Sequence, residues 1–271
     1  MRLLPALFFA ALVSGTAQAQ DAGALRARHA ALKEQLASNP FGRPLHVESS
    51  VSGGTHKGEI YAVIEQPYRV VAPALARTAH WCDILTLQVN IKRCDAADEK
   101  LAAFITRKAR DPADGAHRVE FSYQVLGSSA DYLQVALRAP SGPVGTRDYQ
   151  IRLEAAPLDS RRTFIHLSYA YTLGTMARFA MDGYLAGAGR DKRGFSVEGG
   201  ERAVVERGAM RHYLAIEAHL DSLGAPAGQR LEKRLRGWYA AISRYPQLQE
   251  RVGPDEYVEM KRKQAAAVAA G

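Results

Sequence analysis

The feature that most constrains this chain is a pattern that recurs between residues 87 and 173, where short stretches place an apolar side chain at every second position. Successive side chains of a β-strand point to opposite faces, so each stretch predicts a strand with one buried face. Polar turns, such as Asp-Pro-Ala-Asp-Gly at 111–115, favour antiparallel connections between neighbours. The pattern predicts a meander of five or six strands with one face in water, over residues 87–91, 119–125, 133–137, 149–155 and 165–173, with another short run at 101–108.

A sheet with one apolar face needs a cover, and the longest helix candidate, residues 201–224, is suited to provide it. This stretch contains no Pro, begins with acidic residues and ends at Gly224, shortly before Pro226. Its apolar side chains share an arc of roughly 80° on a helical wheel. The arc contains Val205, Ala209, Tyr213, Ile216, Leu220 and Leu223, with Met210 and Leu214 beyond it.

The remaining segments complete an α+β fold class. Helical spacing recurs over 21–38, 175–185 and the basic tail after Pro226, and a Ser-Gly-Gly-Thr turn joins two strand-like runs at 45–51 and 57–65. After these two runs, Pro67 and Pro73 should confine a regular helix mainly to 74–85. We therefore expect a domain over 20–224 and a C-terminal helical extension over 225–271.

The first nineteen residues predict a cleaved secretory signal. They contain one basic residue, Arg2, then an apolar run over 3–13 and an Ala-Gln-Ala ending at Ala19. A single spanning helix is the alternative, but the run is shorter than the ~20 residues that a bilayer core requires. The mature chain is therefore expected to begin near Gln20, to be soluble and to be periplasmic.

The charge balance favours anionic partners. The net charge of +8 becomes +7 once Arg2 is removed with the signal, and such an excess suits lipid headgroups at a membrane surface. Export argues against nucleic acid as the partner. The alternative interpretation is that the positive charge serves only solubility.

Two cysteines, Cys82 and Cys94, make up the whole cysteine content. An even count in an exported chain predicts a disulfide, and closing so short a loop stabilises the fold by on the order of 3 kcal/mol in the loop-entropy model. Two buried thiols are the alternative.

Motifs for common chemistries are missing from the sequence. Residues 194–198, Gly-Phe-Ser-Val-Glu, lack the closing glycine of a nucleophile elbow, and there is no HExxH, CxxC or P-loop. His212 and His219 are interpreted as surface or packing residues rather than metal ligands. We therefore predict no catalytic residue, no metal and no cofactor.

Hydroxyl and carboxylate groups collect on the two surfaces that should face each other across the sheet and the long helix. A filled core rarely holds so many polar groups, because each needs a partner, whereas a cavity for an amphipathic ligand explains them. In the alternative, the tyrosines lie at sheet margins and the glutamates pair with arginines. The ligand-binding residues predicted on this basis are Trp81, Tyr123, Tyr149, Tyr169, Tyr171, Glu206, Met210, Tyr213 and Glu217.

The chain resembles a known superfamily. The order of helix, two strands, helix, antiparallel meander and long helix over 45–224 resembles the START-like, helix-grip fold that includes the Bet v 1-type proteins. The stretch Pro-Val-Gly-Thr-Arg-Asp-Tyr at 143–149 is similar to the segment that begins a late strand in START domains. The usual His-Pro and Trp signature is missing between 174 and 200. The resemblance implies a deep apolar tunnel between sheet and helix that binds a lipid, a sterol-like compound or another hydrophobic small molecule.

Three functions from different classes follow. The first is a carrier that shields a lipid across the periplasm, where each exposed CH₂ costs about 0.8 kcal/mol. The second is a cyclase- or hydrolase-type enzyme on the same superfold that uses Glu206 or Glu217 as a general base. The third is a structural envelope protein with a packed core and no ligand.

Overall fold

The computed structural model describes residues 14–270, so most of the expected signal segment, 1–13, lies outside the described residues. Eight helices and eight strands alternate in groups along the described chain. The helices are α1 (Ser14–Ala31), α2 (Lys33–Ala37), α3 (Tyr68–Leu75), α4 (Thr78–Leu85), α5 (Thr175–Ala186), α6 (Gly200–Ser222), α7 (Ala227–Ser243) and α8 (Pro254–Ala270). The strands are β1 (Leu45–Ser52), β2 (Thr55–Ile64), β3 (Ile91–Ala97), β4 (Lys100–Ile105), β5 (His117–Ser128), β6 (Leu133–Ser141), β7 (Thr146–Pro157) and β8 (Thr163–Leu173).

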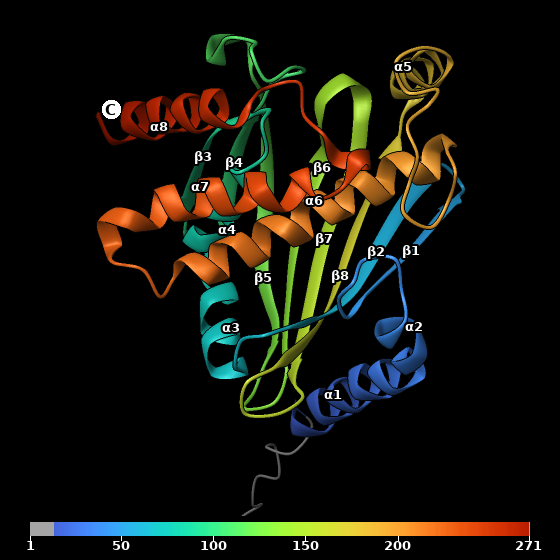
Figure 1. The fold of residues 1–271 in the computed structure, drawn as a ribbon, viewed down its shortest axis with the longest axis vertical. Helices are drawn as coiled ribbons and strands as arrows, with labels where there is room; N and C mark the ends of the chain where they lie inside the picture. The colour runs from blue at the N-terminus through green and yellow to red at the C-terminus, as the bar shows by residue number, and fades with distance from the viewer. Residues whose placement is uncertain (1–13, 271) are drawn as a thin grey trace, which may run out of the picture.

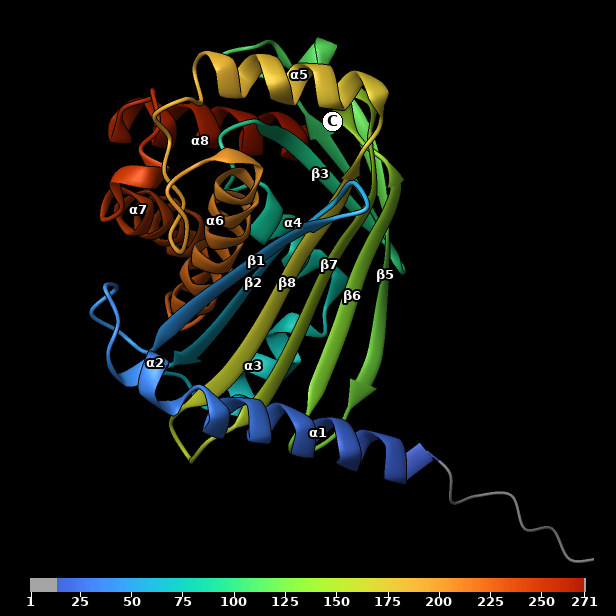
Figure 2. The ribbon, with the colours of Figure 1, turned by 90° about the vertical axis from the view of Figure 1, so that its right-hand side faces the viewer.

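All eight strands form one antiparallel sheet in the order β1-β2-β8-β7-β6-β5-β4-β3. Strands β3 to β8 are the predicted meander, and the β1–β2 hairpin joins its far edge when β2 pairs with β8. Figure 2 shows the sheet curving around α6. The α+β class and the START-like, helix-grip arrangement predicted from sequence are confirmed by this strand order and by the position of α6.

The concave face of the sheet holds the main core. Helix α6 crosses β1, β2 and β8, and α7 lies beside it, while α4 and α8 cover the β3–β4 end (Figure 1). The apolar residues of α6 share one continuous cluster with Leu235, Trp238 and Ile242 of α7 and with Tyr257 of α8. The predicted boundary at 224/225 stays a prediction, and the core runs across it.

The opposite face of the sheet is only partly in water. Leu25, Leu32 and Leu36 of the predicted 21–38 helix are buried against Tyr61 and Phe164 on the outer side of the sheet. Helices α1 and α2 therefore cover one end of the face that alternation alone predicted to be wet.

Two local predictions are wrong. Residues 87–90 form turns rather than a strand, and β3 begins only at Ile91. Leu87 is buried in the main core, and its carbonyl accepts from the Tyr257 hydroxyl of α8 at 2.8 Å instead of from a neighbouring strand. The second error concerns the helix predicted mainly over 74–85. Helix α3 begins earlier, at Tyr68 directly after Pro67, and contains Pro73. A separate helix, α4, follows from Thr78 to Leu85.

The predicted disulfide is confirmed. Cys82 in α4 is bonded to Cys94 in β3, with 5.2 Å between their Cα atoms. The bond ties the helix to the edge strand of the meander. Within the described residues, no helix is both long and apolar enough to cross a bilayer.

Candidate functional site

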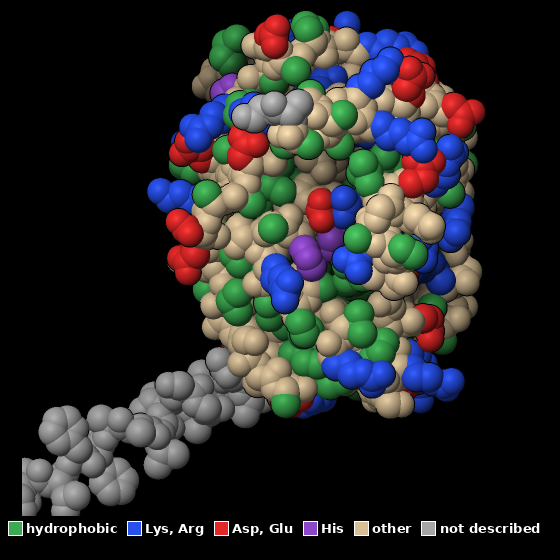
Figure 3. Space-filling model, turned by 90° about the vertical axis from the view of Figure 1, so that its left-hand side faces the viewer, with side chains coloured by type: hydrophobic (Ala, Val, Ile, Leu, Met, Phe, Trp, Pro, Cys, Tyr) green, Lys and Arg blue, Asp and Glu red, His purple; other side chains and the backbone are tan. Residues whose placement is uncertain are grey.

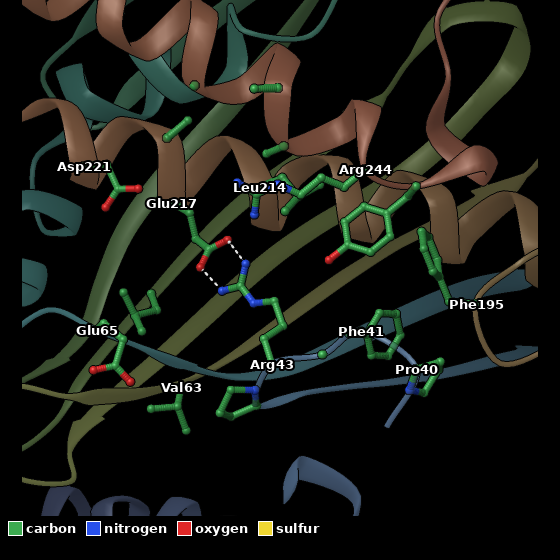
Figure 4. Close-up of a pocket in the computed structure, with 18 of the residues that line it drawn as sticks. Pro40, Phe41, Arg43, Val63, Glu65, Phe195, Leu214, Glu217, Asp221 and Arg244 are labelled. Carbon is green, nitrogen blue, oxygen red and sulfur yellow. Dashed lines mark hydrogen bonds and ion pairs between the residues drawn. The ribbon is translucent and has the colours of Figure 1, made fainter. Parts of the chain in front are cut away.

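A cleft of about 820 Å³ opens between the 40–44 loop, the end of β2, α6, α7 and the 3-10 turn Pro246–Leu248 (Figure 4). The cleft lies beside the long helix α6, at the β1–β2 edge of the fold, and not between α6 and the sheet, where the tunnel was predicted. Its volume is in the range of small-molecule sites. Charged groups at one end and aromatic rings at the other give the cleft an amphipathic lining.

An ion pair forms the middle of the cleft wall. Arg43 donates to both carboxylate oxygens of Glu217, with Nη1 2.9 Å from Oε2, and donates from Nη2 to the Tyr213 hydroxyl at 2.7 Å. The Tyr213 hydroxyl in turn donates to Glu217 Oε1 at 2.7 Å. Burial opposes the charge of Arg43, but Tyr213 and Glu217 outweigh it and raise its pKa. For Tyr213, burial acts in the opposite direction and raises the pKa well above its ordinary value, so the hydroxyl keeps its proton.

Three aromatic rings enclose one end of the cleft. The ring centroids of Phe41, Phe195 and Tyr245 lie 5.6–6.2 Å from one another. Phe41 is positioned by the end of α2, where Asn39 accepts from the Phe41 amide at 3.0 Å and donates to helix carbonyls. At the opposite end, Glu65 and Asp221 carry carboxylates, and Figure 4 shows the two ends on either side of the Arg43–Glu217 pair.

The Phe195 ring is held in place by a buried carboxylate, that of Glu206. Glu206 is fully buried and accepts hydrogen bonds from the amides of Phe195 at 2.5 Å and Ser196 at 2.9 Å, from the Ser49 hydroxyl at 2.6 Å and from the Ser196 hydroxyl. Gly194 leaves room for this contact, because a Cβ there would lie 2.4 Å from Glu206 Oε2. Glu206 therefore fastens the 187–199 loop to β1.

The nine residues predicted as a ligand site do not meet in one place. Tyr149, Tyr169 and Tyr171 do form a cluster, with centroids 5.6–6.4 Å apart, next to the first half of α6. Trp81 and Tyr123 are buried and both donate to the Leu75 carbonyl, at 2.8 and 2.9 Å. Met210 is buried in the main core and Glu206 holds the loop. Glu217 lines the cleft, and the buried Tyr213 donates to it.

Helix α6 and strand β2 are in direct contact at Gly58. A Cβ at Gly58 of β2 would lie 2.9 Å from the Val205 carbonyl oxygen and 3.0 Å from the Ala209 Cβ on α6. Such distances leave no space for a ligand between Gly58 and Ala209.

Both candidate general bases already accept hydrogen bonds within the protein. Glu206 accepts four, all from neutral donors, and Glu217 accepts three, two from Arg43 and one from Tyr213. A reaction that uses Glu206 as the base would first have to break one of its bonds. Within residues 14–270, no group of three or more His, Cys, Asp or Glu side chains is placed to hold a metal ion.

Sequence reasoning missed the residues that shape the cleft most. Arg43, Phe41 and Phe195 lie in loops without periodicity, and Arg43 is 174 positions from its partner Glu217. One signal was available: Arg43 stands between Gly42 and Pro44 at a strand entrance, where a lone cation requires an explanation.

No protein-family profile and no curated protein matches the chain. Similar solved structures include a START superfamily protein from Mycobacterium smegmatis, with 10% identity and a TM-score of 0.41, covering 62% of this chain and 98% of that one. The Zhui aromatase/cyclase from Streptomyces sp. R1128 has 15% identity and a TM-score of 0.39, covering 68% and 99%. Norcoclaurine synthase from Thalictrum flavum, in complex with dopamine and hydroxybenzaldehyde, has 10% identity and a TM-score of 0.39, covering 66% and 99%. Such values carry no argument about ligand or reaction.

Proposed function

We propose that this chain binds an amphipathic, lipid-like molecule in the cleft between the 40–44 loop and α7, and carries it through the periplasm without changing it. The observation that supports the proposal is the polarity gradient along the cleft. The Phe41, Phe195 and Tyr245 rings suit an apolar group, and Glu65 and Asp221 suit a polar head.

One polar atom of the lining lacks a partner within the protein. The side-chain oxygen of Gln247 is buried in the cleft wall and accepts no hydrogen bond from the described residues. A buried acceptor without a donor costs roughly 1 to 3 kcal/mol, so a donor supplied by a ligand or by water would be favourable there.

Carriage across the periplasm follows from the chemistry of such a ligand. An acyl chain in water costs about 0.8 kcal/mol for each CH₂, so a protein that encloses part of the chain lowers the barrier to crossing an aqueous space. The Cys82–Cys94 disulfide supports export, because disulfides persist in oxidising compartments.

Filling the cleft from its exposed side tests the proposal. Ala240 lines the cleft from the surface of α7, so Ala240→Trp adds bulk there without disturbing the core. The matched control is Ala266→Trp, on the exposed surface of α8 and away from the cleft. The measurement is the binding of a fluorescent phosphatidylcholine, whose head carries a cationic group, to both variants, with melting temperatures recorded in parallel.

We expect Ala240→Trp to lose binding by tenfold or more, on the order of the 1 to 3 kcal/mol of overpacking, while Ala266→Trp binds as the unchanged protein does. Equal binding by both variants would contradict the cleft assignment. Mass spectrometry of ligand recovered after incubation separates a carrier from an enzyme, because an enzyme returns a product of different mass.

A further inference from the structure

Helix α5 (Thr175–Ala186) has two apolar sides, and only one of them is covered. Its inner side packs on the domain, where Ala177 is buried with Tyr171, Leu173 and Val205. On its outer side most exposed positions are apolar or small, and the charged Asp182, three positions after Phe179, borders them. The apolar or small residues are Met176, Phe179, Ala180, Gly183 and Ala186.

The exposure of the outer side is unusual for a surface helix, which normally turns polar residues to water. Met176 is 68% exposed and Phe179 is 69% exposed. Val144, in the β6–β7 turn beside the start of α5, has a 47% exposed side chain. We refer to Met176, Phe179 and Val144 as the α5 patch.

The α5 patch is held rigidly at one end of the molecule. The Gly174 amide, just before α5, donates to the Gly145 carbonyl at 3.1 Å, and the Leu173 amide donates to the Gly54 carbonyl at 3.2 Å. The helix is thereby fixed to two turns of the sheet. Figure 2 shows α5 lying across the end of the fold, where a broad flat surface can approach it.

A second copy of the chain is a poor occupant for so small a patch. A stable protein interface buries about 800 Å² on each partner, whereas even an aromatic side chain contributes only about 150 to 250 Å². A bilayer interface requires less area, since a few inserted side chains and nearby cations suffice. We propose that α5 docks this chain on a phospholipid bilayer by inserting Met176 and Phe179.

Charges around α5 fit this occupant. Between 174 and 199 there are four basic and three acidic residues. Arg193 lies 3.3 Å from Glu198. Among residues 14–270, Arg178 and Lys192 form no ion pair with a carboxylate, and Asp182 and Asp191 form none with a cation. The excess is small, so apolar insertion dominates and anionic lipid strengthens it.

The basic tail is a weaker candidate for membrane contact than its composition indicated. Arg234, Arg236, Arg262 and Lys263 are paired with carboxylates of the chain, and Lys261 is buried. On the face toward which the end of α8 points, basic and acidic side chains are interspersed (Figure 3). The structure therefore favours the α5 patch over the basic tail as the membrane contact.

The test is sedimentation of the full chain with phosphatidylcholine vesicles, with and without phosphatidylglycerol. The test variant carries Met176→Asp and Phe179→Asp; the matched control is Val268→Asp, an exposed apolar position on α8. We expect on the order of tenfold or more loss of partitioning in the test variant, none in the control, and stronger binding of the unchanged chain to vesicles that contain phosphatidylglycerol.

A second variant reports insertion directly. Phe179→Trp places an indole at the patch, while Trp81 and Trp238 are buried and provide a constant background. Vesicles should shift its emission to shorter wavelength, and lipids brominated in their acyl chains should quench it. The proposal is overturned if the indole stays in water, if Val268→Asp loses binding as the test variant does, or if the unchanged chain is a dimer that the test variant dissociates. It concerns α5 alone and does not depend on a ligand in the cleft.

Discussion

A single methyl group at Gly58 distinguishes a packed helix–sheet contact from a tunnel. Gly58 lies in β2, paired with Ser49 of β1 and Tyr169 of β8. Its missing side chain would point at α6, 2.9 Å from the Val205 carbonyl oxygen and 3.0 Å from the Ala209 Cβ. Because the nearest atom belongs to the helix backbone, it cannot move by a change of rotamer, and α6 itself must shift.

The free energy of unfolding should therefore fall in Gly58→Ala. Overpacking a core costs about 1 to 3 kcal/mol. Against this, replacing Gly by Ala stabilises by about 0.4 to 1 kcal/mol through the unfolded chain. We expect a net loss of about 1 to 2 kcal/mol, and at about 2 to 4 °C per kcal/mol for a chain of this size the melting temperature falls by roughly 2 to 8 °C.

Thermal unfolding followed by circular dichroism measures this change. The matched control is Gly228→Ala near the start of α7, where no atom lies within 4 Å of the added Cβ. There the melting temperature should stay or rise. If Gly58→Ala also raises it, α6 and the sheet have room between them, and the close packing inferred at Val205 and Ala209 is refuted.

Two further predictions concern stability. Cys82→Ala with Cys94→Ala should lower the free energy of unfolding by on the order of 3 kcal/mol, and a thiol reagent should find no reactive cysteine in the unreduced, denatured chain; two labelled thiols would disprove the bond. His166 lies 2.8 Å from Glu154 and 3.0 Å from Glu59; burial opposes its charge, but the two carboxylates raise its pKa above 6.5, and Glu59, against its own burial, has a pKa lowered from 4.5 to about 2. The stability that His166 contributes is complete below its unfolded pKa and is lost as pH rises through the raised folded value, whereas the contribution of Glu59 is complete above pH 4.5 and is lost toward pH 2. The free energy of unfolding, measured with urea, should therefore include both contributions in full between about pH 4.5 and 6.5. Above that window it should decline less steeply in His166→Gln than in the unchanged protein.

The sequence by itself determined the elements whose signals are local. Alternation with period two located β5 to β8 within a few residues, because successive side chains of a strand point to opposite faces. The acidic start of the long helix and the Gly224 and Pro226 that follow it likewise indicated its two ends. The pairing of Cys82 with Cys94 followed from there being only two cysteines.

Only the tertiary structure decided where a ligand could be held. Polarity patterns show which side of a helix is buried, but they do not distinguish a helix in contact with the sheet from one separated from it by a cavity. In this protein the contact is visible at Gly58, where an added Cβ would lie 2.9 Å from the Val205 carbonyl oxygen. The cleft depends on Arg43 meeting Glu217 across 174 positions and on Glu206 fastening Phe195. Such contacts leave no periodic trace, because loop residues are placed by the elements they join and not by their neighbours in sequence.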